Sequence, residues 1–347
     1  MTGERSRGRE IRSFVLENVL WRSGDIAKAT VERFGISRQA VHKHVAALVA
    51  AGLLEARGAT RRREYRLKAQ LKKTYRFDLS EKPEEDRIWR EQLLPLVAGV
   101  SRNARDILEY GVTEMINNAI DHSGGRNLRV ALEQTAATTE IHLIDDGEGI
   151  FLKIQRTLGL AHPRESVLEL AKGKLTTDPA RHSGEGVFFT SRAVDRFQVR
   201  SGGLHFSYRA GDEDYRLIEN PGGDTGTGVS LLVAHNTRRT LKNVFDRHSS
   251  DDGDYAFVKT RVPVRLAQAD GETLASRSQA KRIATRFEKF REVILDFKGV
   301  ETIGQGFADE LFRVFTATHP QVQLIPVNAG RQVKSMIARA AAGRKRA

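Results

Sequence analysis

Two glycine-containing loops constrain the fold of this chain more than any other feature of its sequence. The first, residues 145–150 (DDGEGI), directly follows a predicted strand at 139–144, which is expected to pair antiparallel with a strand at 127–134. The second contains Gly184 and Gly186 and leads into a predicted helix. Glycine lets the backbone approach a ligand closely, and free N–H groups at the start of a helix favour phosphate. The loops therefore indicate a site for a phosphate-bearing ligand, although either one alone is also typical of a surface turn.

A predicted helix over residues 100–122 carries acidic and amide side chains on one face. Glu114, Asn118 and Asp121 are spaced i, i+4 and i+7, so the helical repeat places them above one another. A carboxylate and an amide oxygen in this arrangement suit Mg²⁺ and a polarised water molecule. A solvated polar face has the same spacing, so the helix points to function only together with the two loops.

The order of these motifs resembles the GHKL superfamily of ATP-binding domains, which includes gyrase-type, chaperone, mismatch-repair, sensor-kinase and anti-sigma-factor-kinase domains. The shared order is E-x-x-x-N-A, D-x-G-x-G, G-x-G and a last strand that begins at Gly226-Thr227-Gly228, and it covers residues 85–236. The resemblance implies an α/β sandwich in which helices cover one face of a mixed sheet. It also implies ATP and Mg²⁺ as ligands.

The resemblance assigns a role to each motif residue. Asn118 would ligate Mg²⁺, and Glu114 would be the general base. Asp145 would accept a hydrogen bond from the adenine amino group, and Thr227 would reach the adenine pocket from the last strand. The other cofactor-binding residues would be Gly147 and Gly149 beside the base and ribose, Ser183, Gly184 and Gly186 beside the phosphates, and Asp121 and Lys174.

The same resemblance leaves the chemical outcome open. Residues 159–182, which include Lys172, would form a mobile lid. The chain has no G-x-x-x-x-G-K-[ST] loop, and no histidine lies between His44 and His122 to serve as the phosphoacceptor of a sensor histidine kinase. Glu114 is shared with hydrolytic members and with serine/threonine kinases of the anti-sigma-factor type. An ATPase, a protein kinase acting on a partner, and an adaptor with a structural ATP site are therefore all considered.

The first 68 residues predict a winged helix-turn-helix. Helical spacing over 9–20 is followed by IAKATVERF, a turn at Gly35 and Ser37, the segment RQAVHKHVAALVA, and two short strands around an arginine-rich turn. The unit resembles bacterial winged helix-turn-helix transcription factors, which implies contact with double-stranded DNA. The expected DNA-binding residues are Arg38, Gln39, His42 and Lys43 in the major groove, and Arg57, Arg61, Arg62 and Arg63 on the backbone or in the minor groove. A protein-docking unit is the alternative.

Strands and helices alternate from residue 255 onward, which predicts a small α/β domain. The run ILDFKGVETIGQGFADELF resembles STAS-like domains, in which the loop that opens the helix carries a phosphorylated serine. Here that loop is Gly304-Gln305-Gly306, which offers no hydroxyl group. We therefore expect this domain to act by contact with a nucleotide domain, its own or a partner's, and not by phosphorylation of the loop. A domain with only a packing role is the alternative.

The length allows two or three domains, of α+β and α/β type by the elements above, and the net charge raises the question of an anionic partner. The 347 residues include no cysteine, and 57 Lys/Arg outnumber 44 Asp/Glu for a net charge of +13. The basic excess is concentrated before residue 70, which favours DNA as the partner of the N-terminal unit. No apolar run is long enough to span a membrane, so we expect a cytoplasmic protein. The expected division is 1–68, a linker at 69–84, 85–236, a linker at 237–254, and 255–347.

Overall fold

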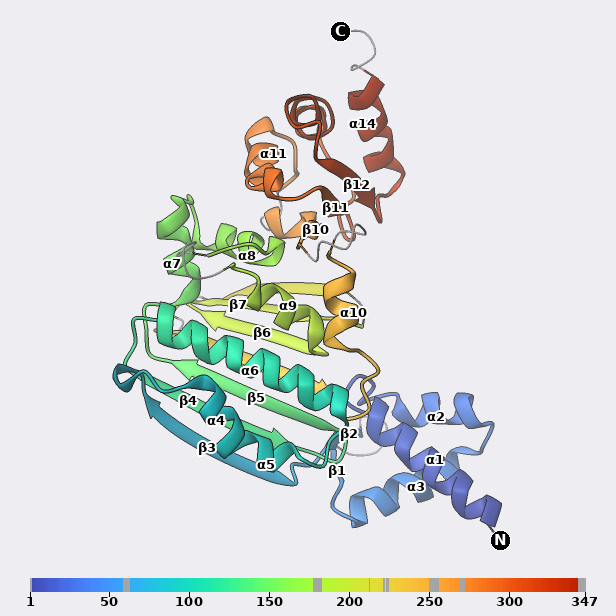
Figure 1. The fold of residues 1–347 in the computed structure, drawn as a ribbon. Helices are drawn as coiled ribbons and strands as arrows, with labels where there is room; N and C mark the ends of the chain where they lie inside the picture. The colour runs from blue at the N-terminus through green and yellow to red at the C-terminus, as the bar shows by residue number, and fades with distance from the viewer. Residues whose placement is uncertain are drawn as a thin grey trace.

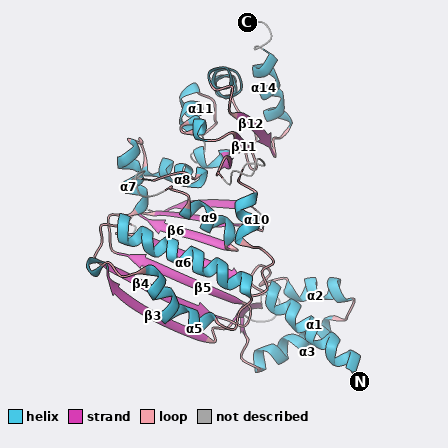
Figure 2. Ribbon diagram, viewed as in Figure 1, coloured by secondary structure: helices cyan, strands magenta, loops and turns pink. Residues whose placement is uncertain are grey.

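The computed structural model of the protein describes residues 2–58, 63–176, 183–211, 213–220, 222, 225–249, 256–268 and 272–342. A large central sheet lies between a helical N-terminal unit and a smaller C-terminal unit (Figures 1 and 2). Within the described residues, no helix is long and apolar enough to cross a membrane. Arg61 and Arg62, which were expected to contact DNA, lie outside the described residues.

Three helices and an antiparallel strand pair form the N-terminal unit. They are α1 (Thr2–Asn18), α2 (Ile26–Phe34), α3 (Arg38–Ala50), β1 (Leu54–Arg57) and β2 (Glu64–Leu67). Gly35 ends α2 in a left-handed conformation with φ 62°, and the Ser37 hydroxyl accepts a hydrogen bond from the Ala40 N–H at 3.2 Å to start α3. The unit has a hydrophobic cluster of its own, which includes Val15, Val41 and Tyr65. The elements follow one another in the order expected from the sequence.

The central sheet has seven strands in the order β3-β4-β5-β9-β6-β7-β8. The strands are β3 (Leu71–Asp78), β4 (Asn127–Gln134), β5 (Thr138–Asp145), β6 (Arg196–Ser201), β7 (Leu204–Arg209), β8 (Asp214–Glu219) and β9 (Gly228–Ala234). Each described neighbouring pair is antiparallel, because the last strand, β9, inserts between β5 and β6 and runs opposite to both. The expected mixed sheet is therefore corrected to an antiparallel one.

Helices cover one face of this sheet (Figure 1). They include α4 (Glu85–Ile88), α5 (Leu94–Val97), α6 (Arg102–His122) and α9 (Gly186–Ala193). Two further helices, α7 (Ile150–Leu158) and α8 (Pro163–Lys172), lead from β5 toward the C-terminal unit. The helix α10 (Leu241–Asp246) follows β9. The two expected linkers are largely structured. Residues 69–84 contain the edge strand β3, and α10 packs through Phe245 against Tyr110 of α6, with ring centroids 5.6 Å apart.

The C-terminal unit is a three-stranded parallel sheet with helices. It contains β10 (Lys259–Pro263), α11 (Arg277–Ala284), β11 (Glu292–Asp296), α12 (Gln305–Asp309), α13 (Thr316–Thr318), β12 (Gln323–Val327) and α14 (Arg331–Ala342), with strand order β10-β11-β12. The alternation of strands and helices matches the expectation. One continuous hydrophobic cluster joins this unit to the central one, so the two units share a core.

The Gly304–Gly306 loop packs on one side against residues 274–275 of its own domain. The N–H of Gly304 donates to the Leu274 carbonyl at 2.8 Å, and the N–H of Phe307 donates to the Ala275 carbonyl at 3.1 Å. A Cβ on Gly304 would lie 2.6 Å from the Cα of Ala275, and Phe307 is fully buried. The C-terminal unit contacts its own central unit through other residues, such as Arg286, and contact of this loop with a partner stays a prediction.

Candidate functional site

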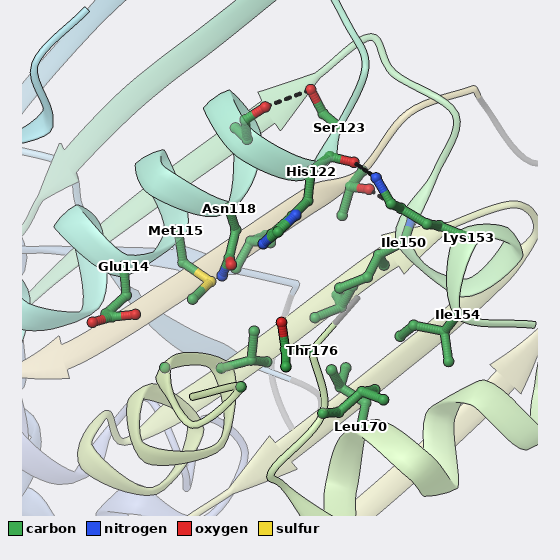
Figure 3. Close-up of a pocket in the computed structure, with 18 of the residues that line it drawn as sticks. Glu114, Met115, Asn118, His122, Ser123, Ile150, Lys153, Ile154, Leu170 and Thr176 are labelled. Atoms are coloured by element: carbon green, nitrogen blue, oxygen red, sulfur yellow. Dashed lines mark hydrogen bonds between the residues drawn. The ribbon is translucent and has the colours of Figure 1, made fainter. Parts of the chain in front are cut away.

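A cavity of about 300 Å³ opens between α6, the loop after β5, α7 and the start of α9. In Figure 3, Glu114, Asn118 and His122 lie along α6, while Ile150, Lys153 and Ile154 come from α7. The sequence-predicted residues that line the cavity are Glu114, Asn118, Asp145, Gly149, Ser183, Gly184, Gly186 and Thr227. Apolar side chains complete the walls: Met115, Ile150, Ile154, Leu170, Leu175, Val187, Phe197, Val199 and Val229. A cavity that is mostly apolar with a few converging polar groups is typical of a small-molecule site.

Asp145 is held at the end of β5 with one carboxylate oxygen fixed. Oδ1 accepts hydrogen bonds from the N–H of Gly147 at 2.9 Å and from the N–H of Thr227 at 3.2 Å. Burial raises the pKa of this carboxyl group, and the two backbone donors act in the opposite direction. Within the described part of the chain, no group donates to Oδ2. The side chain therefore presents a fixed acceptor to the cavity.

The first glycine loop owes its shape to two positions where no side chain fits. A Cβ on Gly147 would lie 2.1 Å from the carbonyl oxygen of Ser123, and Gly149 has φ 91° with a Cβ position 2.6 Å from the Ser201 hydroxyl. Gly147 does not line the cavity itself. Its role is to let the loop turn against the end of α6, where the N–H of Glu148 donates to Ser123 at 3.0 Å.

Thr227, which directly precedes β9, lies beside Asp145 in the cavity wall. Its backbone carbonyl accepts from the Asp145 N–H at 3.0 Å, and its hydroxyl accepts from the Ile150 N–H at 3.0 Å at the start of α7. The residue therefore connects the last strand to both ends of the glycine loop. This contact explains why a threonine from a strand far along the chain belongs to the cavity wall.

Glu114 and Asn118 project from α6 one turn apart. The side-chain nitrogen of Asn118 is buried and has no hydrogen-bond partner within the described residues. A buried polar atom without a partner costs roughly 1–3 kcal/mol, so a bound ligand that accepts a hydrogen bond from this NH₂ group would recover that energy. Glu114 reaches the start of α9, where a Cβ on Gly186 would lie 1.9 Å from its Oε2. Only glycine lets the carboxylate approach the backbone this closely.

The second glycine loop closes against the segment after α8. Gly184 has φ 72°, and a Cβ there would lie 2.4 Å from the backbone of Leu175, whose N–H donates to the Gly184 carbonyl at 3.0 Å. Leu175, Thr176 and Ser183 all line the cavity. Part of the expected lid, residues 177–182, lies outside the described residues.

His122 and Lys153 line the cavity although the sequence did not single them out. The ammonium group of Lys153 donates to the His122 carbonyl at 2.6 Å (Figure 3) and pairs with Glu148 at 3.5 Å. This contact ties α7 to the end of α6. The sequence position of Lys153 could have indicated its place in the site. It lies one turn into the helix that starts at the glycine loop, so its ammonium group is beside the region expected to bind phosphate.

One aspartate and two lysines that were expected at the site do not line the cavity. Asp121 is exposed at the end of α6 and does not line the cavity. Lys174 donates to the Lys289 carbonyl at 3.0 Å and lies over the rings of Phe257 and Phe290, so it faces the C-terminal unit. Lys172 is fully buried. The structure thus places both expected lid lysines away from the cavity.

Lys172 belongs to a buried ionic triad with Glu169 and Arg286. One Glu169 oxygen accepts from Lys172 at 2.5 Å, and the other accepts from Arg286 at 2.9 Å. The exposed fractions of Lys172, Glu169 and Arg286 are 0%, 2% and 8%. Burial lowers the pKa of Lys172 to about 8, while the carboxylate of Glu169 opposes the shift. The triad joins α8 of the central unit to the C-terminal unit.

Backbone groups extend this triad to the cavity wall. Arg286 donates to the carbonyl groups of Gly173, at 2.6 Å, and Lys174. Lys172 donates to the Thr285 carbonyl at 2.9 Å. The residues that follow directly, Leu175 and Thr176, line the cavity. The C-terminal unit therefore holds the backbone that forms one side of the site.

The predicted DNA-binding residues of the N-terminal unit are exposed where the structure describes them. These are Arg38, Gln39, His42 and Lys43 on α3, and Arg57 and Arg63 beside the turn between β1 and β2. His42 and Arg63 line one depression together with Tyr65, so α3 and the strand pair face the same hollow. Arg57 pairs with Glu55 at 3.0 Å, which partly offsets its charge.

Two segments of the chain match known domain families. Residues 80–206 match a histidine kinase-like ATPase domain, and residues 279–334 match a STAS-like domain of unknown function. No curated protein matches the chain. The protein therefore contains a GHKL-like ATPase domain and a C-terminal STAS-like domain, as the two resemblances predicted. The first match ends before β9, so Thr227 is placed at the cavity by the fold alone.

Proposed function

We propose that the protein is a regulator that binds Mg·ATP in the cavity between α6 and β9. The observation that carries this proposal is Asp145, whose Oδ1 is fixed by two backbone N–H groups while Oδ2 stays available for an adenine amino group. Apolar side chains surround this acceptor, as a flat purine base requires. Titration calorimetry of the protein with Mg·ATP tests the proposal, and absence of heat and of binding by equilibrium dialysis would remove it.

The residues around the cavity fit the remaining parts of the nucleotide. Asn118 would offer its amide oxygen to Mg²⁺, with the other ligands coming from phosphate and water, since Mg²⁺ takes oxygen ligands and few protein groups. Ser183, Gly184 and Gly186 would meet the phosphates at the start of α9. Glu114 reaches this same helix start. Hydrolysis, transfer to a serine or threonine, and simple sensing are distinguished by incubating the protein with γ-labelled ATP and following the label.

The proposed action of the STAS-like domain is to hold the lid. Its Arg286 binds the backbone of Gly173 and Lys174, and these residues lead directly into the cavity wall. ATP binding and docking of the STAS-like domain would then favour each other, because both stabilise the same position of the chain. A signal that loosens the domain would weaken ATP binding.

Arg286→Ala is expected to weaken ATP binding and to speed hydrogen exchange in residues 163–176. Breaking a buried ion pair costs about 3–5 kcal/mol, and here it also removes the donor to two lid carbonyl groups. Arg282→Ala is the control, because Arg282 pairs with Glu165 at 2.8 Å across the same interface but is half exposed. Calorimetry and exchange measured by mass spectrometry should separate the two variants. Equal behaviour of both would contradict a role of the triad in lid position.

The N-terminal unit is proposed to bind double-stranded DNA through α3. The supporting observation is that α3 exposes Arg38, Gln39, His42 and Lys43 and carries no exposed acidic residue. Hydrogen-bond donors on an exposed helix suit base edges in the major groove, whereas a protein-docking face would be expected to expose apolar groups. Contact with DNA would give the ATP-dependent unit a transcriptional output.

Arg38→Ala and His42→Ala are expected to reduce discrimination between DNA sequences by about 1–3 kcal/mol each. Selected duplexes from a randomised library, measured by fluorescence anisotropy, give the preferred and the competing sites. Arg33→Ala, at the exposed end of α2, serves as a control that should change affinity for all duplexes alike. Failure of the wild-type protein to retain any duplex at low salt would favour the docking alternative.

A further inference from the structure

The sheet face opposite the helices is lined by exposed and half-buried side chains. Along β4, for example, Leu128 and Val130 are buried under the helices while Arg129 between them is exposed. The same alternation holds on β6, where Val199 and Ser201 are buried and Arg200 is exposed. Because side chains alternate along a strand, these exposed residues share one face of the sheet.

In one row across this face, every charged or titratable residue is basic. Strand register places Arg76 of β3 opposite Arg129 of β4 and, further across the sheet, Arg200 of β6 opposite His205 of β7. The residues that complete the row between and beyond them are Ile144, Gly228 and Ile218. No acidic residue belongs to the row. No ion pair or side-chain hydrogen bond to a described residue is formed by Arg76, Arg129 or Arg200.

This lack of compensation is specific to the row. Elsewhere on the same face Lys72 pairs with Glu133 at 2.7 Å, and Arg196 pairs with Glu140 at 3.1 Å. Two arginines directly opposite each other on neighbouring strands repel and destabilise a sheet. The register also places Arg196 opposite Arg209, but Glu140 pairs with Arg196 there, whereas no acidic side chain pairs with Arg76 or Arg129 within the described residues. A bound anion between them would remove the repulsion.

The length of the row indicates which kind of anion could contact all three arginines. From β3 to β6 the sheet crosses four inter-strand spacings, which is roughly 19 Å at about 4.8 Å each. A free phosphate or a mononucleotide would reach Arg76 and Arg129 but not Arg200. A duplex, with one phosphate about every 3.4 Å along each strand, offers charges over the whole distance. The neighbouring Ile144 and Ile218 are 37% and 56% exposed, so the surface is open along its length.

The N-terminal unit adjoins this sheet directly. Its Trp21 ring lies 5.1 Å from the guanidinium of Arg209 on β7, and Gln70, just before β3, donates to the Gly52 carbonyl at 2.9 Å. Only three residues separate β2 from β3. We propose that the Arg76–Arg129–Arg200 row contacts the phosphate backbone of duplex DNA, in addition to the contacts made by α3. This inference rests on the proposed DNA binding of the N-terminal unit.

The test compares two triple variants of the full-length protein. Arg76→Gln, Arg129→Gln and Arg200→Gln combined remove the row, while Arg331→Gln, Lys334→Gln and Arg339→Gln combined remove the same charge from exposed positions of α14. Binding to a duplex of arbitrary sequence is measured over a range of salt concentrations. Each lost phosphate contact lowers the slope of log K against log salt by about 0.9, so the row variant should lose about 2.7 and the α14 variant close to zero.

Three other outcomes bear on the proposal. Equal slopes for the row variant and the α14 variant would overturn it while leaving DNA binding by α3 intact. Absence of duplex binding by the wild-type protein at low salt would overturn both. Binding of poly-glutamate that depends on the three arginines, together with unchanged DNA slopes, would assign the row to an acidic protein instead. Calorimetric ATP binding by the row variant, equal to that of the wild type, confirms that it is folded.

Discussion

Asp145→Asn is expected to weaken ATP binding by about two orders of magnitude while leaving the protein folded. The N–H groups of Gly147 and Thr227 both donate to Oδ1 of Asp145, so an asparagine must place its own oxygen there. Its NH₂ group then occupies the Oδ2 position and points a donor at the donor of the adenine amino group. A buried donor left without an acceptor costs roughly 1–3 kcal/mol, which corresponds to about 5- to 150-fold in affinity for each such group.

Inosine triphosphate provides a sharp control for this prediction. Hypoxanthine carries an acceptor oxygen where adenine carries its amino group, so the asparagine side chain would match it. The variant should therefore prefer inosine triphosphate to ATP, whereas the wild-type protein should show the opposite order by titration calorimetry. If Asp145→Asn binds ATP as tightly as the wild type, Asp145 does not read the adenine base.

The core of the site was predictable because its signals are local. The strand at 138–145 ends at Asp145, the glycines follow at once, and the α6 face brings Glu114 and Asn118 together by helical repeat alone. These residues meet in one cavity, as their order along the chain indicated. Asp121 shows the limit of the same logic. The α6 residues that line the cavity include Glu114, Asn118 and His122, spaced i, i+4 and i+8, so the cavity lies on the side of the helix that turns away from Asp121.

Several strands were missed although some carry a readable pattern. Residues 196–219 form β6, β7 and β8, in which apolar side chains such as Phe197, Val199 and Phe206 alternate with polar ones around a Gly202-Gly203 turn. That period-two pattern predicts a hairpin. The edge strand β3 is harder to find, because Lys73 occupies an inward position and breaks the alternation. Its polar character made the segment resemble a linker.

The surroundings of the two lid lysines could not be predicted from the sequence. Lys172 is buried because Glu169 and Arg286 surround it, and Arg286 lies more than a hundred residues further along the chain. A lysine in a glycine-containing segment near a phosphate site has the same local sequence whether it meets a phosphate or a buried carboxylate. Only the docking of the C-terminal unit decides between these surroundings. The same reason explains why Lys174 faces Phe257 and Phe290.

Glu114→Gln is expected to retain ATP binding and to lower hydrolysis or phosphoryl transfer by about 10² to 10⁴. The position of the carboxylate supports this role, since it lies one helical turn from Asn118 and directly against the backbone of Gly186 at the start of α9. A general base there would accept the proton of a water molecule or hydroxyl group that attacks the terminal phosphate. Glutamine has the same shape but cannot take up that proton, so the Gly186 contact and the nucleotide pocket should persist.

Glu185→Gln is the matched control, because a second carboxylate lies close to the first. Burial and the negative charges of Glu114 and Glu185 together raise the pKa of Tyr110, which places both acids near this one side chain. Only Glu114 lines the cavity, so removal of Glu185 should leave the rate within a few-fold of the wild type. Single-turnover release of labelled phosphate, or label retained on a partner protein, measures the rate in each variant. Loss of binding together with rate in Glu114→Gln would make Glu114 a structural residue, and a larger loss in Glu185→Gln would transfer the role of base to Glu185.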